Sequence, residues 1–544
     1  MLARIGLWIA TGAAAMAAEG AAVGPALQRV EVAEYASCEQ VELAIGDLIR
    51  SGAAQPRDAI TIDQETTTGW LLRTPQGPEK LRWPQDLLNV RPGAPPLTLD
   101  PKLRGRFDVF VRVRAVDATG ALGIDGKRDD ALPMAFELAL DDGSAREVVG
   151  AKGFPDNHFD TDVLAAHDWD LSARKLVLSP VGKPVYLYGF RFVPSARAAV
   201  ASGRTVSRWL ATDHVTIATD PARHFAFPGV ARLPNGELVV VYREGTIHGV
   251  EPTGKVSLSR STDGGRTWLP RVTALDRPGI DDRDPSVFQM SDGTLLLTSS
   301  DCLCTSADGG RTWSEARATP VFGPHGAVED EEGHIVYGAL QRGVQSELTR
   351  IGGRRVVLQA DAAFRSRDQG LSWEPAGLGI YTVYLPGALD FIWYDEPFMC
   401  VVPKRFWVFA ARVDLDGYAR IIRSPDRGKT WQPLIRTPVW GYPQHLLPLR
   451  DGRLLMSYGY RRPPYGIRAC LSADDGKTWD LDNEIILRQD GGTAADQPTK
   501  VGSTDLGYAV SVQLEGDTIL TVYYFNQNGS NCFIAGTFWQ LPKR

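Results

Sequence analysis

The fold of this chain is decided by an eight-residue phrase, Ser261-Thr-Asp-Gly-Gly-Arg-Thr-Trp268, which recurs through its second half. The shared pattern is Ser-x-Asp-x-Gly-x-x-Trp, and the four further copies begin at Ser306, Ser366, Ser424 and Ser472. Ser and Asp side chains accept hydrogen bonds from nearby backbone N–H groups. Glycine adopts the left-handed conformation without steric cost, and tryptophan buries a large apolar surface. Five copies of one hairpin turn therefore predict a repeat architecture.

The spacing of these phrases predicts the blades of a β-propeller. Successive tryptophans are 45, 60, 58 and 48 residues apart, which is the range of a four-stranded blade. Six hairpins alternate with the phrases, and each consists of an apolar run, a turn and a second apolar run. We therefore predict an all-β chain whose residues 207–544 form a six-bladed β-propeller, closed by a strand at 214–218 against the last blade.

Residues 1–18 have the pattern of a secretory signal peptide. Arg4 precedes an apolar or small run over residues 5–17, and that run ends in a small-x-small cleavage motif. A buried N-terminal helix is the alternative interpretation. We expect an exported protein, either periplasmic or secreted.

Residues 19–200 contain no copy of the phrase, and we predict that they form an accessory β-sandwich. Alternating apolar and polar residues in segments 107–114, 135–140 and 185–192 predict half-buried strands separated by polar turns. Two roles stay open for this region, a carbohydrate-binding domain and a structural appendage.

Composition narrows the class of function. The 544 residues carry a net charge of -6 and no basic run, which argues against nucleic-acid binding. After the first residues, no segment is apolar enough to span a membrane. The six cysteines are scattered, so no disulfide framework is predicted. No cofactor and no metal ion is expected, because the sequence shows no short-range ligand motif.

Candidate site residues follow from the geometry of a propeller. Its inner strands converge on the axis, so polar residues at the ends of those strands share one funnel. A purely structural ring would fill these positions with small or apolar residues. Polar residues occur here in all six predicted blades, and the candidates are Arg243, His248, Asp284, His325, Glu396, Arg412, His445, Arg461, Arg462, Asp505 and Tyr508.

The repeated phrase resembles the Asp-boxes of sialidases and related bacterial repeat proteins, and the resemblance covers residues 207–544. The segments around Glu396, Arg412 and Tyr508 are similar to sialidase segments that supply a glutamate, an arginine and a tyrosine nucleophile. The resemblance implies an exo-acting glycosidase that releases a terminal acidic sugar with retention of configuration. Tyr508 would be the nucleophile, and Glu396 would accept its proton because tyrosine is a poor nucleophile at its ordinary pKa of about 10.

The resemblance also implies three arginines that bind the carboxylate of the substrate, because guanidinium groups match carboxylates bidentately. Arg412 and either Arg461 or Arg462 would supply two of them. The place of another is taken by Ala226, and we expect Arg243, on the following strand, to compensate.

The acid/base residue departs from the family pattern as well. The loop over residues 246–251 lacks the expected aspartate, and His248 is positioned there like a proton carrier, with Glu244 and Glu251 as lesser candidates. A solvated loop histidine is the alternative interpretation of His248. Asp284 is the second candidate acid, and its Arg-Asp-Pro phrase also resembles that of five-bladed furanosidases.

His325, His445 and Asp505 are expected to bind the hydroxyl groups of the sugar. A metal site formed by His325, His445 and His248 is the weaker alternative. Sialic acid is the leading substrate and a uronic acid its competitor. Two further functions stay open, a polysaccharide lyase acting on uronate polymers and a glycan-binding propeller without catalysis.

Overall fold

The computed structural model describes the propeller nearly throughout and the N-terminal region in part. The described residues are 27–33, 41–44, 48, 54–55, 61–64, 70–74, 77–81, 86–90, 93, 95–114, 134–151, 160–182, 185–195, 205–341, 348–351, 354–384, 394–413, 417–462, 464–492, 505–527 and 532–543. The predicted signal peptide, residues 1–18, lies outside them. No helix in the described part of the chain is long and apolar enough to cross a membrane.

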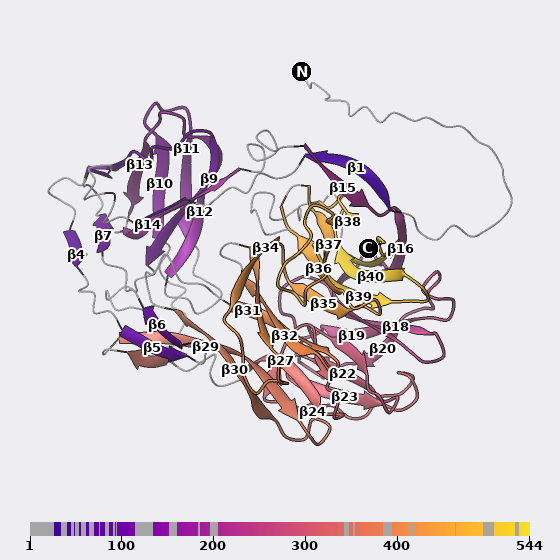
Figure 1. Ribbon diagram of the computed structural model, residues 1–544. Helices are drawn as coiled ribbons and strands as arrows, with labels where there is room; N and C mark the ends of the chain where they lie inside the picture. Colours follow the sequence, from indigo (N-terminus) through magenta and orange to yellow (C-terminus); the bar gives the residue numbers. More distant parts are fainter. Residues whose placement is uncertain are drawn as a thin grey trace, which may run out of the picture.

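Six β-sheets follow one another around an axis and form the blades of a propeller (Figure 1). Blade one is β17 (His224–Arg232), β18 (Leu238–Gly245), β19 (Lys255–Ser261) and β20 (Val272–Leu275), and blade two is β21 (Ser286–Gln289), β22 (Leu295–Ser299), β23 (Cys302–Ser306) and β24 (Arg317–Ala318). Blade three is β25 (Val321–Phe322), β26 (Ala327–Glu329), β27 (Ile335–Gln341), β28 (Leu348–Ile351), β29 (Arg354–Ser366) and β30 (Glu374–Tyr384).

The remaining three blades complete the ring. Blade four is β31 (Tyr394–Val402), β32 (Phe406–Val413), β33 (Tyr418–Ser424) and β34 (Ile435–Trp440), and blade five is β35 (Gln444–Pro448), β36 (Leu454–Tyr460), β37 (Gly466–Ser472) and β38 (Ile485–Arg488). Blade six is β39 (Gly507–Gln513), β40 (Thr518–Phe525), β41 (Phe533–Gln540) and β16 (Asp213–Ala218). Strand β16 pairs antiparallel with β41, so a strand from before blade one closes the ring as predicted. The predicted all-β, six-bladed fold is confirmed.

The blades pack face to face because their strands are apolar on both faces. In β18, Val240 packs with residues of blade six such as Leu520, whereas Val239 packs with residues of blade two such as Leu295. Successive side chains of a strand point to opposite faces, so the unbroken apolar run over residues 238–242 serves two neighbours at once.

Each Ser-x-Asp-x-Gly-x-x-Trp phrase forms the turn between the last two strands of its blade in chain order. In the first copy, Ser261 Oγ accepts the N–H of Gly265 at 2.8 Å, and Asp263 Oδ1 accepts the N–H of Thr267 at 2.9 Å. Gly265 has a φ of 94°, a left-handed conformation that favours glycine. Hydrogen bonds from Thr267 and Ser261 lower the pKa of Asp263 to about 2. The serine and aspartate side chains of the phrase therefore form these hydrogen bonds within the turn.

The N-terminal region contains two facing sheets. One has the order β11 (Arg146–Ala151), β10 (Met134–Leu140), β13 (Leu176–Val181), β8 (Leu97–Leu99) and β3 (Ala54–Gln55). The other has the order β12 (Asp160–Asp170), β9 (Arg106–Arg114), β14 (Val185–Pro194), β7 (Asp86–Val90) and β4 (Thr61–Gln64), with β2 (Val41–Ala44) beside β14. Val109, Val111, Phe136, Leu138 and Phe190 form part of their common core. Strands β5 (Trp70–Thr74) and β6 (Gly77–Leu81) pair as a separate hairpin.

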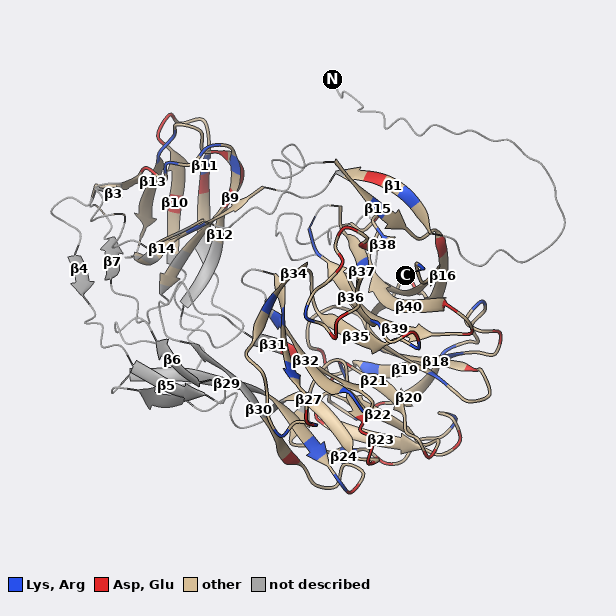
Figure 2. Ribbon diagram, in the orientation of Figure 1, with Lys and Arg blue, Asp and Glu red and all other residues tan. Residues whose placement is uncertain are grey.

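The first described strand belongs to the propeller rather than to this sandwich. Strand β1 (Gln28–Ala33) pairs antiparallel with β15 (Thr205–Leu210), which pairs in parallel with β38 at the edge of blade five. The sandwich is therefore inserted between two strands of one sheet, which differs from the predicted assignment of all residues 19–200 to the sandwich. Charges of both signs are interspersed over the described loops and strands of the propeller (Figure 2).

Candidate active site

The inner strands of four blades begin with the same unusual backbone conformation. Phe227, Asp284, Glu396 and Tyr508 have φ values of 55°, 51°, 45° and 48°. Left-handed conformations are uncommon outside glycine, and they persist where the surrounding structure enforces them, often at functional sites. In three of these blades the pairing with the second strand shifts register beside this residue. The bulge gives one residue per blade a common orientation at the start of its inner strand.

Tyr508, Glu396 and Arg412 meet although they come from three different strands, β39, β31 and β32. Tyr508 Oη donates a hydrogen bond to one carboxylate oxygen of Glu396, and Arg412 donates to the other. Burial would raise the pKa of Glu396, but Arg412 and the hydrogen bond from Tyr508 lower it below its ordinary value. Burial and the charge of Glu396 raise the pKa of Tyr508 well above its ordinary value. An ionised carboxylate is thus placed to accept the phenolic proton.

The guanidinium groups of Arg412 and Arg461 lie over the same aromatic ring, that of Tyr442. The guanidinium carbons of Arg412 and Arg461 lie 4.8 and 5.2 Å from the centre of the Tyr442 ring. Arg461 is held by hydrogen bonds from Nε to the carbonyl of Leu506 at 2.9 Å and from Nη2 to Tyr524 Oη at 3.2 Å. Two guanidinium groups that flank one aromatic ring offer a binding place for a carboxylate.

Arg462 lies apart from this pair. Its guanidinium lies over the ring of Trp440 at 4.3 Å, and its Nε donates to Tyr460 Oη at 2.8 Å. Neighbouring residues at the end of a strand point to opposite sides, so only Arg461 of the two predicted candidates joins Arg412. The substrate-binding role predicted for Arg462 is not supported by this geometry.

Arg243 does not compensate for the arginine that Ala226 replaces. Its side chain is fully buried, and Nε and Nη2 donate to the two carboxylate oxygens of Asp281 at 2.8 and 2.9 Å. Nη1 and Nη2 also donate to the carbonyl oxygens of Ile247 and Gly249 at 2.8 and 3.1 Å. These bonds occupy the guanidinium, so Arg243 stabilises the loop over residues 246–251 and is not available to a substrate.

Asp284 lies at the same inner-strand position as Glu396 and has the opposite electrostatic tendency. Burial raises its pKa above the ordinary value, and the charge of Glu396 raises it further, although Arg283 opposes both effects. The carboxylate is 3.7 Å from Arg283 Nε and keeps 28% of its side chain exposed. A carboxyl group with a raised pKa that still reaches solvent is suited to donate a proton.

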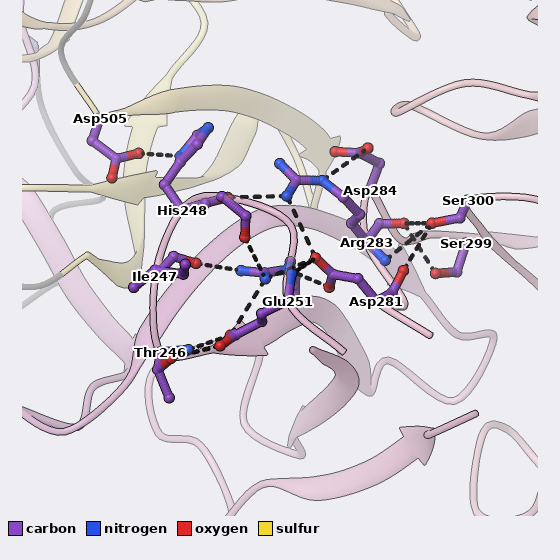
Figure 3. A network of polar contacts seen from close by, with 12 residues as sticks. Thr246, Ile247, His248, Glu251, Asp281, Arg283, Asp284, Ser299, Ser300 and Asp505 are labelled. Carbon is purple, nitrogen blue, oxygen red and sulfur yellow. Dashed lines mark hydrogen bonds and ion pairs between the residues drawn. The ribbon is translucent and has the colours of Figure 1, made fainter. Parts of the chain in front are cut away.

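The imidazole of His248 is paired with the carboxylate of Asp505 (Figure 3). Its Nδ1 lies 2.8 Å from Asp505 Oδ1, and the second oxygen of Asp505 lies 2.7 Å from Nε2 of His224. Burial would raise the pKa of Asp505, but the hydrogen bonds from both histidines lower it far below its ordinary value. Both oxygens of Asp505 are engaged, so the substrate-binding role predicted for Asp505 is replaced by a role in holding two imidazoles.

His325 and His445 lie together on the buried side of Tyr508. The His325 ring centre is 5.6 Å from that of Tyr508 and 6.2 Å from that of His445. Burial lowers the pKa of both histidines to about 3, so they are neutral imidazoles. Both ring nitrogens of His325 are buried without a hydrogen-bond partner among the described residues. Each of these ring nitrogens can form one further hydrogen bond.

The alternative metal site of His325, His445 and His248 does not form. Within the described residues, His248 shares a group of closely spaced ligand atoms with His224 and Asp505 instead. His224, Phe227 and Tyr442 lie among these residues although they were not predicted as site residues. Phe227 and Tyr442 each precede a proline at the start of an inner strand, as Glu396 does, so an alignment of the six strand starts would have found them.

No protein-family model and no curated protein matches the sequence. Among solved structures, the chain is similar to a protein of unknown function from Dyadobacter fermentans DSM 18053, at 27% identity over 61% of this chain and 98% of that chain, with a TM-score of 0.51. It is also similar to a Hadza microbial sialidase, at 16% identity over 82% of this chain and 95% of that chain, with a TM-score of 0.43. An alpha-L-arabinanase from Penicillium chrysogenum, complexed with arabinobiose, is 16% identical over 60% of this chain and 98% of that chain, with a TM-score of 0.43. These neighbours include a sialidase.

Proposed function

We propose that this protein is an exported, exo-acting glycoside hydrolase that releases a terminal acidic sugar with retention of configuration. The observation that carries the proposal is the contact between Tyr508, Glu396 and Arg412, which three separate strands bring together. Export rests on the pattern of residues 1–18 alone.

The first half of the reaction uses Tyr508 as the nucleophile. Its oxygen attacks the anomeric carbon while its proton passes to Glu396, and the bond to the leaving oxygen breaks as that oxygen is protonated. In the second half, water attacks the same carbon, the bond to Tyr508 breaks, and Glu396 returns the proton to the tyrosine. Asp284 and His248 are the two groups that can protonate the leaving oxygen and deprotonate the water.

An acidic sugar is favoured by the charges at the site. Arg412 and Arg461 flank the Tyr442 ring and can bind a carboxylate. A neutral tyrosine nucleophile avoids the repulsion that a carboxylate nucleophile would meet from an anionic sugar, which is why sialidases depart from the two-carboxylate rule. A sialic acid is the leading substrate. A uronic acid is the alternative, because Arg243 is committed to Asp281 and leaves only two of the three expected arginines.

The test is a panel of 4-methylumbelliferyl glycosides that includes an α-sialoside, a β-glucuronide and a neutral β-galactoside. We expect turnover of an acidic substrate and a loss of about 10³-fold or more in Tyr508→Phe. Tyr523→Phe is the matched control, because Tyr523 is equally buried but bonds to Thr537 between blade strands. Equal turnover in Tyr508→Phe and wild type would reject the nucleophile.

A polysaccharide lyase remains a candidate because the same residues could neutralise a uronate and abstract a proton. Its product would carry a double bond conjugated with the carboxylate, and this group absorbs ultraviolet light at about 235 nm. Incubation with uronate polymers and an absorbance scan separates the two reactions. Tight binding of acidic glycans without turnover of any substrate would instead favour a binding propeller.

A further inference from the structure

His224, His248 and Asp505 form a cluster that the proposed reaction does not yet explain. They come from the start of β17, from the loop after β18 and from the segment before β39. One carboxylate lies between two imidazoles, with N···O distances of 2.7 Å to His224 and 2.8 Å to His248. The carboxylate is well buried, whereas half of the His248 side chain is exposed.

The distances favour hydrogen bonds over a bound metal ion. The ligand atoms lie within 4.8 Å of one another, which is close enough to consider a transition metal. Two ligands of a tetrahedral zinc ion, at bond lengths of about 2.0–2.2 Å, are however separated by about 3.3 Å. Separations of 2.7 and 2.8 Å are those of hydrogen bonds to an ionised carboxylate.

Two arginines hold the loop that carries His248 by donating hydrogen bonds to three successive carbonyl oxygens of its backbone. Arg243 donates to the carbonyl oxygens of Ile247 and Gly249, and Arg283 Nη1 donates to that of His248 at 3.0 Å. In Figure 3, Arg283 and Asp505 contact His248 from different sides. Backbone and side chain of His248 are thus both held, although the residue lies in an exposed loop.

His248 lies next to the reacting groups. The ring of Phe227 is 5.5 Å from His248 and 4.7 Å from Tyr508, measured between ring centres, so one aromatic ring separates the two side chains. The carbonyl oxygen of His248 also accepts a hydrogen bond from Arg283, the neighbour of Asp284 in the sequence. His248 and Tyr508 can therefore face one bound sugar from two sides.

We infer that His248 is the acid/base residue of the reaction, and that Asp505 and His224 are the residues that position it. Asp505 accepts the Nδ1–H of His248 and leaves Nε2 for the substrate, and His224 holds the second oxygen of Asp505. In the first half of the reaction Nε2–H protonates the leaving oxygen as its bond to the sugar breaks. In the second half the neutral Nε2 takes a proton from water as water attacks the sugar. The inference rests on the proposed function.

Leaving groups of different basicity test the acid role. A methyl glycoside of the sugar that the panel identifies needs a protonated leaving oxygen, whereas a 2,4-dinitrophenyl glycoside releases a stable anion. In His248→Ala we expect kcat/KM to fall about 10²–10⁴-fold for the methyl glycoside and less than about tenfold for the dinitrophenyl glycoside. Asp505→Asn should show the same selective loss to a smaller extent.

The matched control is a second histidine–aspartate pair in the sandwich. His167 Nδ1 lies 2.8 Å from Asp108 Oδ1, and 44% of the His167 side chain is exposed while Asp108 is fully buried. His167→Ala removes the same kind of pair from the sandwich and not from the propeller, so we expect neither substrate to be affected. An equal loss for both substrates in His248→Ala would overturn the acid role.

A measurement without substrate separates this inference from the proposed function. Long-range ¹H–¹⁵N spectra of the histidine side chains report which ring nitrogen carries the proton, and the chain contains only eight histidines. We expect neutral His248 to be protonated at Nδ1 in wild type and to lose this preference in Asp505→Ala. Retention of the preference in Asp505→Ala would overturn the positioning role, even if no glycoside is turned over.

Titration with Zn²⁺ in the same samples tests the alternative occupant. We expect no tight, stoichiometric binding that depends on Asp505. The control is His334→Ala, because His334 forms a second candidate group with Asp330 and Glu332. If one equivalent of Zn²⁺ binds, is lost in Asp505→Ala and is kept in His334→Ala, the cluster is a metal site and the inference is overturned.

Discussion

The outer turns and the inner strand starts of this propeller both place aspartates in left-handed or tightly turned backbone, yet the two regions treat them oppositely. In the outer turn, hydrogen bonds from Thr267 and Ser261 lower the pKa of Asp263 to about 2. At the axis, burial and the charge of Glu396 raise the pKa of Asp284. The ionised form is therefore favoured in the repeated turn and disfavoured for Asp284 at the axis.

The difference arises from what surrounds each carboxylate. Both oxygens of Asp263 accept hydrogen bonds from donors within its own turn, so the ionised form is stabilised. The carboxylate of Asp284 has the side chain of Arg283 at 3.7 Å and a second carboxylate nearby. A residue type therefore indicates function here only together with its blade position. Four predictions test the contrast between the two regions.

The largest effect is expected at the axis, in Glu396→Gln. Glutamine keeps the size of the side chain and can still accept from Arg412, but it cannot take the proton of Tyr508. We expect kcat to fall by about 10³-fold or more, with a melting temperature within a few degrees of wild type. Steady-state kinetics and calorimetry on the same preparation check both statements. Wild-type kcat in Glu396→Gln would contradict the proton-acceptor role.

A smaller effect is expected from the arginines that flank Tyr442. Arg461→Lys keeps the positive charge but loses the planar fork, so KM for an acidic substrate should rise about 10–100-fold. Arg462→Lys is the matched control, because Arg462 stacks on Trp440 and should leave KM within about twofold. A larger effect in the control than in Arg461→Lys would reverse the assignment of the two neighbours.

Much of the fold could be predicted from the sequence because its repeats are local. The turn phrase carries its own hydrogen bonds, and its spacing determines the blade size, so the six blades and the closing strand followed from residue patterns. The insertion of the sandwich between β1 and β15 did not, since the pairing of residues 28–33 with 205–210 leaves no local signal.

The sequence predicted the site residues that their positions on the blade strands identify, but not the contacts between residues far apart in the sequence. Tyr508 and Glu396, at the starts of inner strands, and Arg412, near the end of the following strand, were predicted from segments that resemble a known family. Arg243 was assigned wrongly, because its partner Asp281 lies 38 residues away and only the folded chain shows that the guanidinium is already occupied. The pairing of Asp505 with two histidines was missed for the same reason. In the sequence, His248 lies 257 positions and His224 lies 281 positions from Asp505.

The substitution Asp284→Asn is expected to raise the stability of the protein at pH 7 and to lower its turnover. A carboxyl group whose pKa is higher in the folded than in the unfolded chain binds more protons when folded, so its contribution to stability falls as pH rises through the interval above 3.8. Asparagine removes this contribution, and we expect the melting temperature to rise at pH 7 and not at pH values below about 3.5. Turnover should fall by less than in His248→Ala. A lower melting temperature at pH 7 would contradict the raised pKa.

The smallest effect on activity is expected in the outer turn, in Asp263→Asn. The lowered pKa means that Asp263 stabilises the folded chain above pH 3.8, and that this contribution is lost as pH falls toward about 2. The variant should therefore be less stable than wild type at pH 7, and the difference should shrink as the pH is lowered toward 2. Turnover per folded molecule should stay within about twofold of wild type, because the turn lies between the third and fourth strands of its blade and not at the axis. Thermal unfolding at several pH values checks the first statement. A loss of turnover without a loss of stability would show that the repeated turns take part in the chemistry, and the contrast between the two regions would fail.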